Sequence, residues 1–438
     1  MPSPSPSRRS DVDFVFEQVR RHHAWFDACL PMIASENLIS PLARQLLVSD
    51  FHDRYAEGHP GKRYYQGLAF IDEVERRCAE LARELFGCSH ADVRPTSGTN
   101  ANMAAFFALA QPGDAITALG TASGGHISHA KFGSAGQRGL AIHTYPWNDR
   151  EMNLEVEGAK KLIREVRPKV VVLGGSVFLF PHPVSEIAPV AREVGARVMY
   201  DGAHVLGLIA GGRFQDPLRE GADVMTGSTH KTLPGPQGAV LLSNLDDSEE
   251  NAKLKKKLDS AVFPGVVSSH HLHHMAAKAV TFAEHLEFGR DYASQVVANA
   301  KALGQALHEE GVKVLCEHKG FTESHQVVVD VREHGGGKWA AEALERGNVI
   351  TNMNMLPGDE KPMNPSGLRL GSQELTRIGL RPADMGDVAR FVRQVVVDKV
   401  APEKVRADVA EFRKGFRGVR YCFEEGTPAY EFWTLAVK

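Results

Sequence analysis

Cysteine is scarce in this sequence: five of the 438 residues are cysteines, and none of them has CxxC spacing. This suits reduced thiols in a cytoplasmic protein better than a disulfide framework. No stretch approaches the roughly 18 uninterrupted apolar residues of a membrane span, so we expect no membrane partner. The formal net charge is −3, which leaves no basic excess for a polyanion, and we do not expect nucleic acid as a partner.

The chain starts with MPSPSPSRRS, which is rich in proline and serine and has no apolar run behind it. We therefore expect neither a signal peptide nor a membrane anchor, and we expect about the first ten residues to be disordered. A chain of this length favours a large and a smaller domain. The predicted division is an N-terminal arm over 1–40, a large domain over 41–287, and a smaller α/β domain over 288–438.

Lys231 lies in the polar turn STHKTLPGPQG, between two short apolar runs, ADVM and GAVLLS, that have the character of strands. The turn is rich in hydroxyl groups and glycine, so backbone and side chains can close around a bound group. Most lysines are solvated surface residues. A lysine at such a turn instead matches what a Schiff-base lysine requires.

Two further features strengthen this interpretation. Asp201 ends the apolar run ARVMYD, at the carboxyl end of a predicted parallel strand, where open α/β sheets bind ligands. Ser97, Gly98 and Thr99 stand directly before a helical pattern, whose N-terminus can hold a phosphate. A phosphate cradle, a strand-end acid and a lysine, in this order, predict a pyridoxal phosphate site. The alternation of strands and helices around Asp201 predicts a parallel sheet with helices on both faces.

Several motifs then appear in one order: MIASENLISP, YAEGHPGKRYYQG, SGTNAN, GGHISH, DGAHVLG, STHKTLPGPQG and SGLRLG. In this the chain resembles serine hydroxymethyltransferase, and the resemblance runs from Met32 to Arg377. It implies an α/β fold of the fold-type I pyridoxal phosphate transferases, with a mainly parallel seven-stranded sheet in the large domain. It also implies a homodimer with shared active sites, with the pairing of dimers into tetramers left open.

The resemblance assigns roles to individual residues. Tyr55, Glu57 and Tyr65 would reach the active site of a neighbouring subunit, with Glu57 handling a proton at the substrate hydroxyl. Arg369 would bind the substrate carboxylate through its guanidinium group. The expected catalytic residues are Lys231, Glu57, His126, Tyr65 and Tyr55. The expected cofactor-binding residues are Ser97, Gly98, Thr99, His126, Ser176, Asp201, His204, Ser228, His230, Lys231, Ser268 and Ser269. The expected substrate-binding residues are Ser35, Tyr55, Glu57, Tyr65, His204 and Arg369.

The segment SSHHLHH departs from the folate-using pattern, which has Gln-Gly-Gly-Pro where residues 267–270 stand. In that family the run contributes backbone to the cofactor phosphate of the partner subunit, and the resemblance implies that Ser268 and Ser269 could take over this role. Together with Gln237 the segment looks more like the methanopterin-using branch. His270, His273 and His274 would share one face of a helix, which could suggest metal ligation. Because no carboxylate or cysteine completes the set nearby in the sequence, we expect no metal.

Three functions remain open at this stage. The first is hydroxymethyl transfer between serine and glycine, with tetrahydrofolate or tetrahydromethanopterin as co-substrate. The second is an L-threonine transaldolase or aldolase that passes a glycyl unit to another aldehyde. The third is a protein that binds pyridoxal phosphate without turnover, against which the retention of Lys231, Asp201, His126, Glu57 and Arg369 counts.

Overall fold

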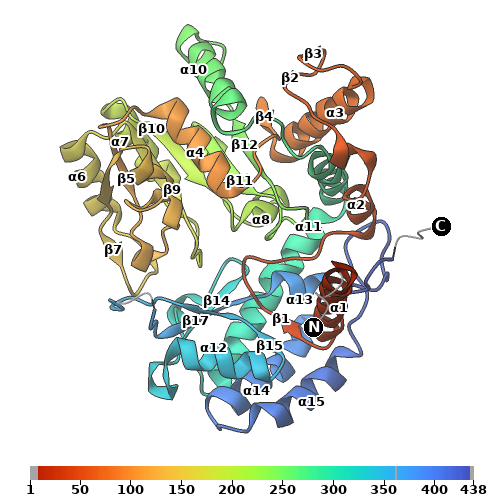
Figure 1. Ribbon diagram of the computed structural model, residues 1–438. Coiled ribbons are helices and arrows are strands. Elements are labelled where there is room, and N and C mark those ends of the chain that lie inside the picture. The colour runs from red at the N-terminus through yellow and green to blue at the C-terminus, as the bar shows by residue number, and fades with distance from the viewer. Residues whose placement is uncertain (1–7, 361–362, 435–438) are drawn as a thin grey trace, which may run out of the picture.

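The computed structural model describes residues 8–360 and 363–434. A seven-stranded sheet forms the centre of the upper body in Figure 1, in the order β4-β12-β11-β10-β9-β5-β6. The strands span β4 His90–Asp92, β12 Ala239–Ser243, β11 Val224–Ser228, β10 Arg197–Asp201, β9 Val170–Gly174, β5 Ala115–Ala118 and β6 Ala141–Thr144. β12 runs antiparallel to both of its neighbours, and the other neighbouring strands are parallel. This confirms the predicted mainly parallel sheet.

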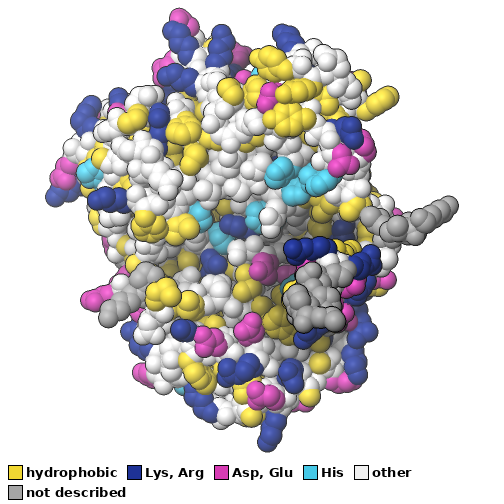
Figure 2. All heavy atoms as spheres, in the orientation of Figure 1, with side chains coloured by type: hydrophobic (Ala, Val, Ile, Leu, Met, Phe, Trp, Pro, Cys, Tyr) yellow, Lys and Arg dark blue, Asp and Glu magenta, His cyan; other side chains and the backbone are white. Residues whose placement is uncertain are grey.

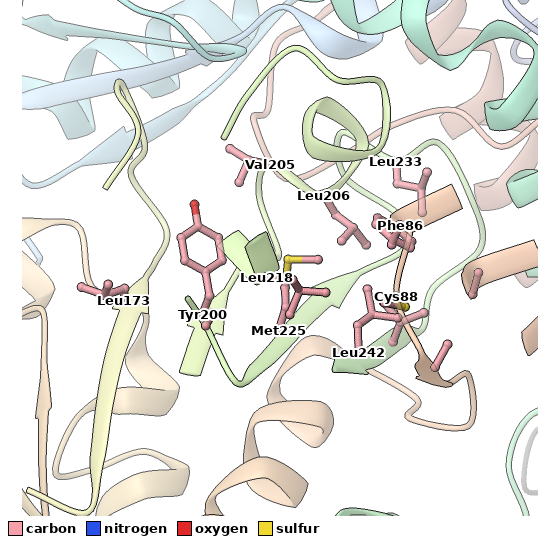
Figure 3. Packing of buried hydrophobic residues seen from close by; sticks show 14 of the residues in the cluster. Phe86, Cys88, Leu173, Tyr200, Val205, Leu206, Leu218, Met225, Leu233 and Leu242 are labelled. Carbon is pink, nitrogen blue, oxygen red and sulfur yellow. The ribbon is translucent and has the colours of Figure 1, made fainter. Parts of the chain in front are cut away.

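Apolar side chains alternate between the two faces of this sheet, and both faces are covered. Leu173, Tyr200, Met225 and Leu242, from four neighbouring strands, belong to one buried cluster (Figure 3). The residues next to them in the strands, such as Val172, belong to a second cluster on the other face. Because successive side chains of a strand point to opposite faces, a strand between two helical layers must be apolar at every position. This accounts for the uninterrupted run VVVLG in β9.

The helices that cover the two faces come before, between and after these strands in the sequence. The first cluster takes residues from α3 (Ala69–Phe86), α6 (Val156–Val166), α7 (Val184–Glu193), α8 (Leu206–Ala210) and α11 (Leu272–Glu309), and the second from α4 (Gly98–Leu109) and α10 (Glu249–Ser260). Each fully buried leucine or phenylalanine stabilises such a layer by about 1.5 to 3 kcal/mol. The layers therefore hold the carboxyl ends of the parallel strands as a fixed platform.

The lower body is built on an antiparallel sheet in the order β13-β14-β17-β16 (Figure 1). Its strands are β13 Lys313–Val314, β14 Gln326–Asp330, β17 Gly367–Gly371 and β16 Asn352–Asn354, and its helices include α12 Gly336–Arg346, α13 Gln373–Arg377, α14 Met385–Val396 and α15 Pro402–Arg413. The 38-residue helix α11 packs against α3 above and α14 below. The predicted boundary at residue 288 falls inside this helix.

The N-terminal arm joins the lower body. β1 (Leu30–Pro31) pairs in parallel with β15 (Val349–Ile350). The preceding helix α1 (Arg8–Asp27) has no buried residue, and Phe14 in it is 64% exposed. Residues 8–10, for which we predicted disorder, belong to α1, while residues 1–7 lie outside the described residues. Among the residues described, no helix has both the length and the apolar character to cross a membrane.

Candidate active site

The predicted cofactor residues converge at the carboxyl edge of the seven-stranded sheet. Asp201 ends β10, Ser228 ends β11, and Lys231 lies in the turn that follows. They border a cavity of about 160 Å³, lined by Ser97, Gly98, Thr99, Asn102, His126, Asp201, Ala203, Ser228, His230 and Lys231. Figure 2 shows histidine and Lys or Arg side chains together in the middle of this face of the molecule, between the upper and lower bodies.

One end of the cavity is the N-terminus of α4. Ser97 caps the helix, and its hydroxyl accepts a hydrogen bond from the backbone N–H of Asn100 at 3.2 Å. Gly98 follows, and a Cβ placed there would lie 2.6 Å from Ser228 Oγ. Any larger residue would therefore close the space between the helix end and the strand end. Free backbone N–H groups, the positive end of the helix and these hydroxyls fit a phosphate group.

Asp201 lies at the other end of the cavity as an ionised carboxylate. Its Oδ2 accepts hydrogen bonds from Asn102 Nδ2 at 2.7 Å and from His129 Nε2 at 3.0 Å, and its Oδ1 accepts from the backbone N–H of Ala203. Burial alone would raise the pKa of Asp201, but the contacts with His129, His126 and Asn102 outweigh it and lower that pKa. A buried carboxylate held ionised fits the protonated ring nitrogen of pyridoxal phosphate.

Asn102 and His129 were not recognised from the sequence. Thr226 Oγ1 donates to Asn102 Oδ1 at 2.6 Å, which leaves the amide nitrogen to point at Asp201. His129 is the last residue of GGHISH, and we had assigned a role only to His126 in that motif. The available signal was therefore a second histidine within a motif already singled out. Asn102 is likewise the last residue of the motif SGTNAN, in which we had assigned roles only to Ser97, Gly98 and Thr99.

Lys231 is 9% exposed, and burial lowers its pKa to about 8, aided by Arg369 and opposed by Asp201. A lysine with such a pKa is neutral in roughly a tenth of molecules at pH 7, far more than an ordinary lysine, and the neutral amine is the nucleophile. The backbone oxygen of Lys231 accepts a hydrogen bond from Asn37 Nδ2 at 2.5 Å. The same nitrogen donates to Tyr292 OH at 2.8 Å, so the N-terminal arm and α11 both fix the turn.

The histidines of the site are kept neutral by burial. Burial lowers the pKa of His126 and of His230 to about 4 each, and lowers that of His204 well below its usual range. His126 Nδ1 lies 2.7 Å from Ser128 Oγ, which fixes the ring. Gln326 Nε2 donates to His204 Nδ1 at 3.2 Å, so the other ring nitrogen carries the proton. These rings can stack on or hydrogen-bond to a neutral group without adding charge.

A second cavity, of about 390 Å³, shares His126 and Lys231 with the first and extends to the lower body. Among the residues that line it are Ser35, Ser176, His204 and Arg369. Arg369, in β17, donates from Nη1 to the backbone oxygen of Ser176 at 2.9 Å and from Nη2 to Asn352 Oδ1 at 3.3 Å. Its buried Nε has no hydrogen-bond partner among the described residues, and burial lowers its pKa to about 10. A buried guanidinium of this kind fits a carboxylate ligand.

The remaining predicted residues lie elsewhere, in an exposed cluster. Tyr55 OH donates to Glu57 Oε1 at 3.1 Å and lies 3.4 Å from Ser268 Oγ, and the backbone N–H of Ala56 donates to Ser269 Oγ at 3.1 Å. The Tyr65 ring lies 5.1 Å from that of Tyr55, and the two tyrosines are 45% and 47% exposed. Neither cavity includes any of these residues.

The three histidines weighed as metal ligands do not share one helical face. α11 begins at Leu272, so His270 precedes the helix, where it lies 3.2 Å from Glu75. His273 and His274 lie within α11, and His273 Nε2 is 3.3 Å from His52 Nδ1. Over residues 8–360 and 363–434, no group of three or more His, Cys, Asp or Glu side chains is arranged to hold a metal ion.

A phosphate cradle, an ionised strand-end aspartate and a buried lysine in this fold define a fold-type I pyridoxal phosphate enzyme. The family model described as serine hydroxymethyltransferase matches residues 9–392. The chain belongs to the serine hydroxymethyltransferase family.

Curated relatives agree with this assignment. A serine hydroxymethyltransferase of Thermococcus kodakarensis is 56% identical over 421 residues, which cover 95% of this chain and 97% of the relative. One of Methanopyrus kandleri is 54% identical over 428 residues, covering 97% and 98%. One of Pyrococcus furiosus is 54% identical over 424 residues, covering 96% and 98%. The transaldolase hypothesis receives no support from these relatives.

Proposed function

We propose that this protein, with pyridoxal phosphate bound, transfers a hydroxymethyl group between serine and glycine, with a reduced pterin as the carrier. The observation that carries the proposal is the meeting of Lys231, Asp201 and Arg369 around two joined cavities. Lys231 and Asp201 suit the cofactor, and Arg369 suits an amino acid. Family membership supports the same activity.

The residues of the first cavity would hold the cofactor. Ser97, Gly98 and Thr99 would bind its phosphate at the N-terminus of α4, and Asp201 would pair with its ring nitrogen. The neutral ring of His126 would lie against the cofactor ring, and Lys231 would attach through its amine. The bound cofactor supplies the electron sink for cleavage of a bond at the amino acid's α-carbon.

Arg369 would select which bond at the α-carbon is cleaved. Its guanidinium would bind the substrate carboxylate, and Ser35 lines the same cavity. With the carboxylate fixed, rotation about the α-carbon is lost and the bond to the side chain can be held in the reactive direction. His204 and Ser176 line the same space and would bound the substrate on the side of the sheet.

A second copy of the chain would complete the site. Tyr55 and Tyr65 are exposed and Glu57 is half-buried, and all three lie outside both cavities, which supports their supply to the site of a partner subunit. There Glu57 would take the hydroxyl proton of serine as the side chain leaves, and return it in the reverse direction. We therefore propose a homodimer with shared active sites.

The carrier and the compartment are also proposals. The SSHHLHH segment and Gln237 favour a pterin of the methanopterin type over tetrahydrofolate. Supporting a cytoplasmic location, all five cysteines are free thiols, the form that a reducing compartment maintains. Cell fractionation with an antibody against the chain would test the location, and recovery in an oxidising compartment would contradict it.

The function is tested by turnover of the purified, cofactor-loaded protein. Serine is supplied with tetrahydrofolate or tetrahydromethanopterin, and in parallel threonine is supplied with a panel of aldehydes. Glycine formation from serine that depends on a pterin is the expected result, and the faster pterin identifies the carrier. Pterin-independent conversion of threonine into acetaldehyde and a new β-hydroxy amino acid, with no turnover of serine, would overturn the proposal.

A further inference from the structure

Two surface segments that are far apart in the sequence contact each other. We call residues 55–65 the tyrosine loop and residues 267–271 the serine segment. The tyrosine loop contains the short hairpin of β2 (Gly58–His59) and β3 (Lys62–Arg63). The contacts are those of Tyr55 with Ser268 and of the Ala56 backbone with Ser269. The contact of Tyr55 with Ser268 is exposed and contributes little rigidity by itself, whereas that of Ala56 with Ser269 is partly buried.

Beneath this surface, one carboxylate oxygen is shared by both segments. Glu75 Oε2 accepts a hydrogen bond from Arg63 Nη2, in the tyrosine loop, at 2.5 Å. The same oxygen lies 3.2 Å from Nε2 of His270, in the serine segment. His270 is 5% exposed and Glu75 is 6% exposed. Both segments therefore contact the same buried oxygen atom, Oε2 of Glu75.

The helix that carries Glu75 is a rigid support. Ile71, Cys78 and Leu81 of α3 are buried in the first hydrophobic cluster, and α3 packs along α11. Asp72, one turn before Glu75, also accepts from Arg63 Nε at 2.8 Å and from the Gly61 backbone at 2.6 Å. The tyrosine loop is thus held at three points on α3, and the serine segment is held through His270.

Glu75 has a basic side chain from each segment beside its carboxylate, Arg63 from the tyrosine loop and His270 from the serine segment. Burial opposes the charged form of Glu75, but its contacts with His270 and Arg63 outweigh burial and lower its pKa. Removing one partner of a buried charge costs more than losing an exposed pair, because the remaining charge is left poorly solvated. The free energy that would be lost by moving His270 away from Glu75 therefore keeps the serine segment in place.

We propose that His270 is a positioning residue, which fixes Ser268 and Ser269 against the tyrosine loop by its contact with Glu75, so that both segments meet the partner's cofactor site as one unit. The proposal rests on the shared active site put forward above. It assigns His270 no contact with substrate or cofactor. It also gives the residue a function distinct from the metal ligation weighed for it on sequence grounds.

The test compares two substitutions of His270 that introduce the same amide group on side chains of different length. In His270→Gln the amide nitrogen takes the place of Nε2 and keeps a polar group within reach of Glu75. In His270→Asn the side chain is one methylene shorter and does not reach it. His308→Leu is the control, because His308, near the end of α11 and away from both segments, also lies beside a carboxylate, that of Glu317 at 3.4 Å.

Cofactor affinity is measured by titrating the apoprotein with pyridoxal phosphate, without turnover, and serine kinetics follow on the loaded protein. We expect His270→Asn to weaken cofactor binding about tenfold and to lower kcat about tenfold, while the KM for serine stays within about threefold because Arg369 is untouched. His270→Gln and the His308→Leu control should stay within about threefold of the parent protein in all three quantities.

Equal behaviour of the Gln and Asn variants would overturn the proposal, as would a loss in His270→Asn confined to the melting temperature. The comparison also separates this proposal from the proposed function. A tenfold difference in cofactor affinity between the two variants would support the positioning role even if serine proved not to be the substrate. Serine turnover with no such difference would leave the function standing and remove the role of His270.

Discussion

Replacing Arg369 by alanine isolates the contact expected to hold the amino acid. The side chain lies in β17 of the lower body, opposite Asn352 of β16, and reaches the second cavity, where it is 8% exposed. Its Nη groups donate to the Ser176 backbone and to Asn352, and its Nε is unpaired among the described residues. The substitution therefore removes a guanidinium held in place by its neighbours and leaves the cofactor residues intact.

The magnitude follows from the two charge-assisted hydrogen bonds that a carboxylate would receive. A hydrogen bond to a charged group contributes about 1.5 to 3 kcal/mol, and the paired geometry of arginine favours two at once. Water that enters the vacated space solvates the carboxylate and offsets part of this. A net loss of about 2 to 4 kcal/mol remains, which corresponds to a rise of roughly 30- to 700-fold in the KM for serine.

The assay is serine turnover over a wide concentration range, together with titration of pyridoxal phosphate into the apoprotein. Arg369→Lys keeps the charge but loses the two-pronged geometry, so its KM should lie between those of the parent protein and Arg369→Ala. Arg332→Ala removes a half-exposed arginine of the same body and serves as the control. A KM within about threefold of the parent protein in Arg369→Ala would refute the reasoning, and so would equal loss of cofactor affinity.

Three further predictions concern the cofactor, the shared site and a buried histidine. Lys231→Ala should abolish the visible absorbance of the bound cofactor, because no amine remains to attach it, and an unchanged spectrum would exclude Lys231 from that role. Mixing Lys231→Ala with Glu57→Ala subunits should recover about a quarter of the parent activity, because half of the randomly paired dimers are mixed and each mixed dimer has one of its two sites intact. An inactive mixture that contains mixed dimers would exclude sharing. Burial lowers the pKa of His182 to about 3, so the folded protein keeps this ring neutral while the unfolded chain takes up a proton below about pH 6.5. Stability should fall as the pH drops from 7 to 5, and His182→Gln should show a smaller fall in melting temperature over that interval; an equal fall would contradict the assignment.

Local patterns in the sequence predicted much of the fold. The run VVVLG has no polar side chain, as expected of a strand between two helical layers, and it forms β9. The alternation of strands and helices predicted around Asp201 is present, with α7, Val184–Glu193, followed by β10. The domain boundary predicted at residue 288 lies inside α11, which continues from the upper body into the lower body. No local pattern in the sequence marks where a continuous helix passes from one body to the other.

The candidate site was predictable where a residue belongs to a local motif. Lys231 lies in a turn between two strands, Asp201 at the end of a strand, and Ser97 at the start of a helix, and each of these positions can be recognised from neighbouring residues. Membership of a motif did not assign a role to the partners of Asp201, although Asn102 ends SGTNAN and His129 ends GGHISH. Asn102 and His129 are 99 and 72 positions away from Asp201, and only the packing of α4 and the GGHISH loop against β10 brings them together.

The sequence by itself determined the strands and helices, the order of the motifs and the chemistry of each candidate residue, because these depend on neighbouring side chains and their periodicity. Only the tertiary structure decided which residues meet. It placed Arg369 of the lower body on the cavity that contains Lys231, and Gln326 against His204, 122 positions away. It also set His270 against Glu75 rather than among metal ligands. Such contacts depend on how whole layers pack, and the local sequence around each residue does not specify them.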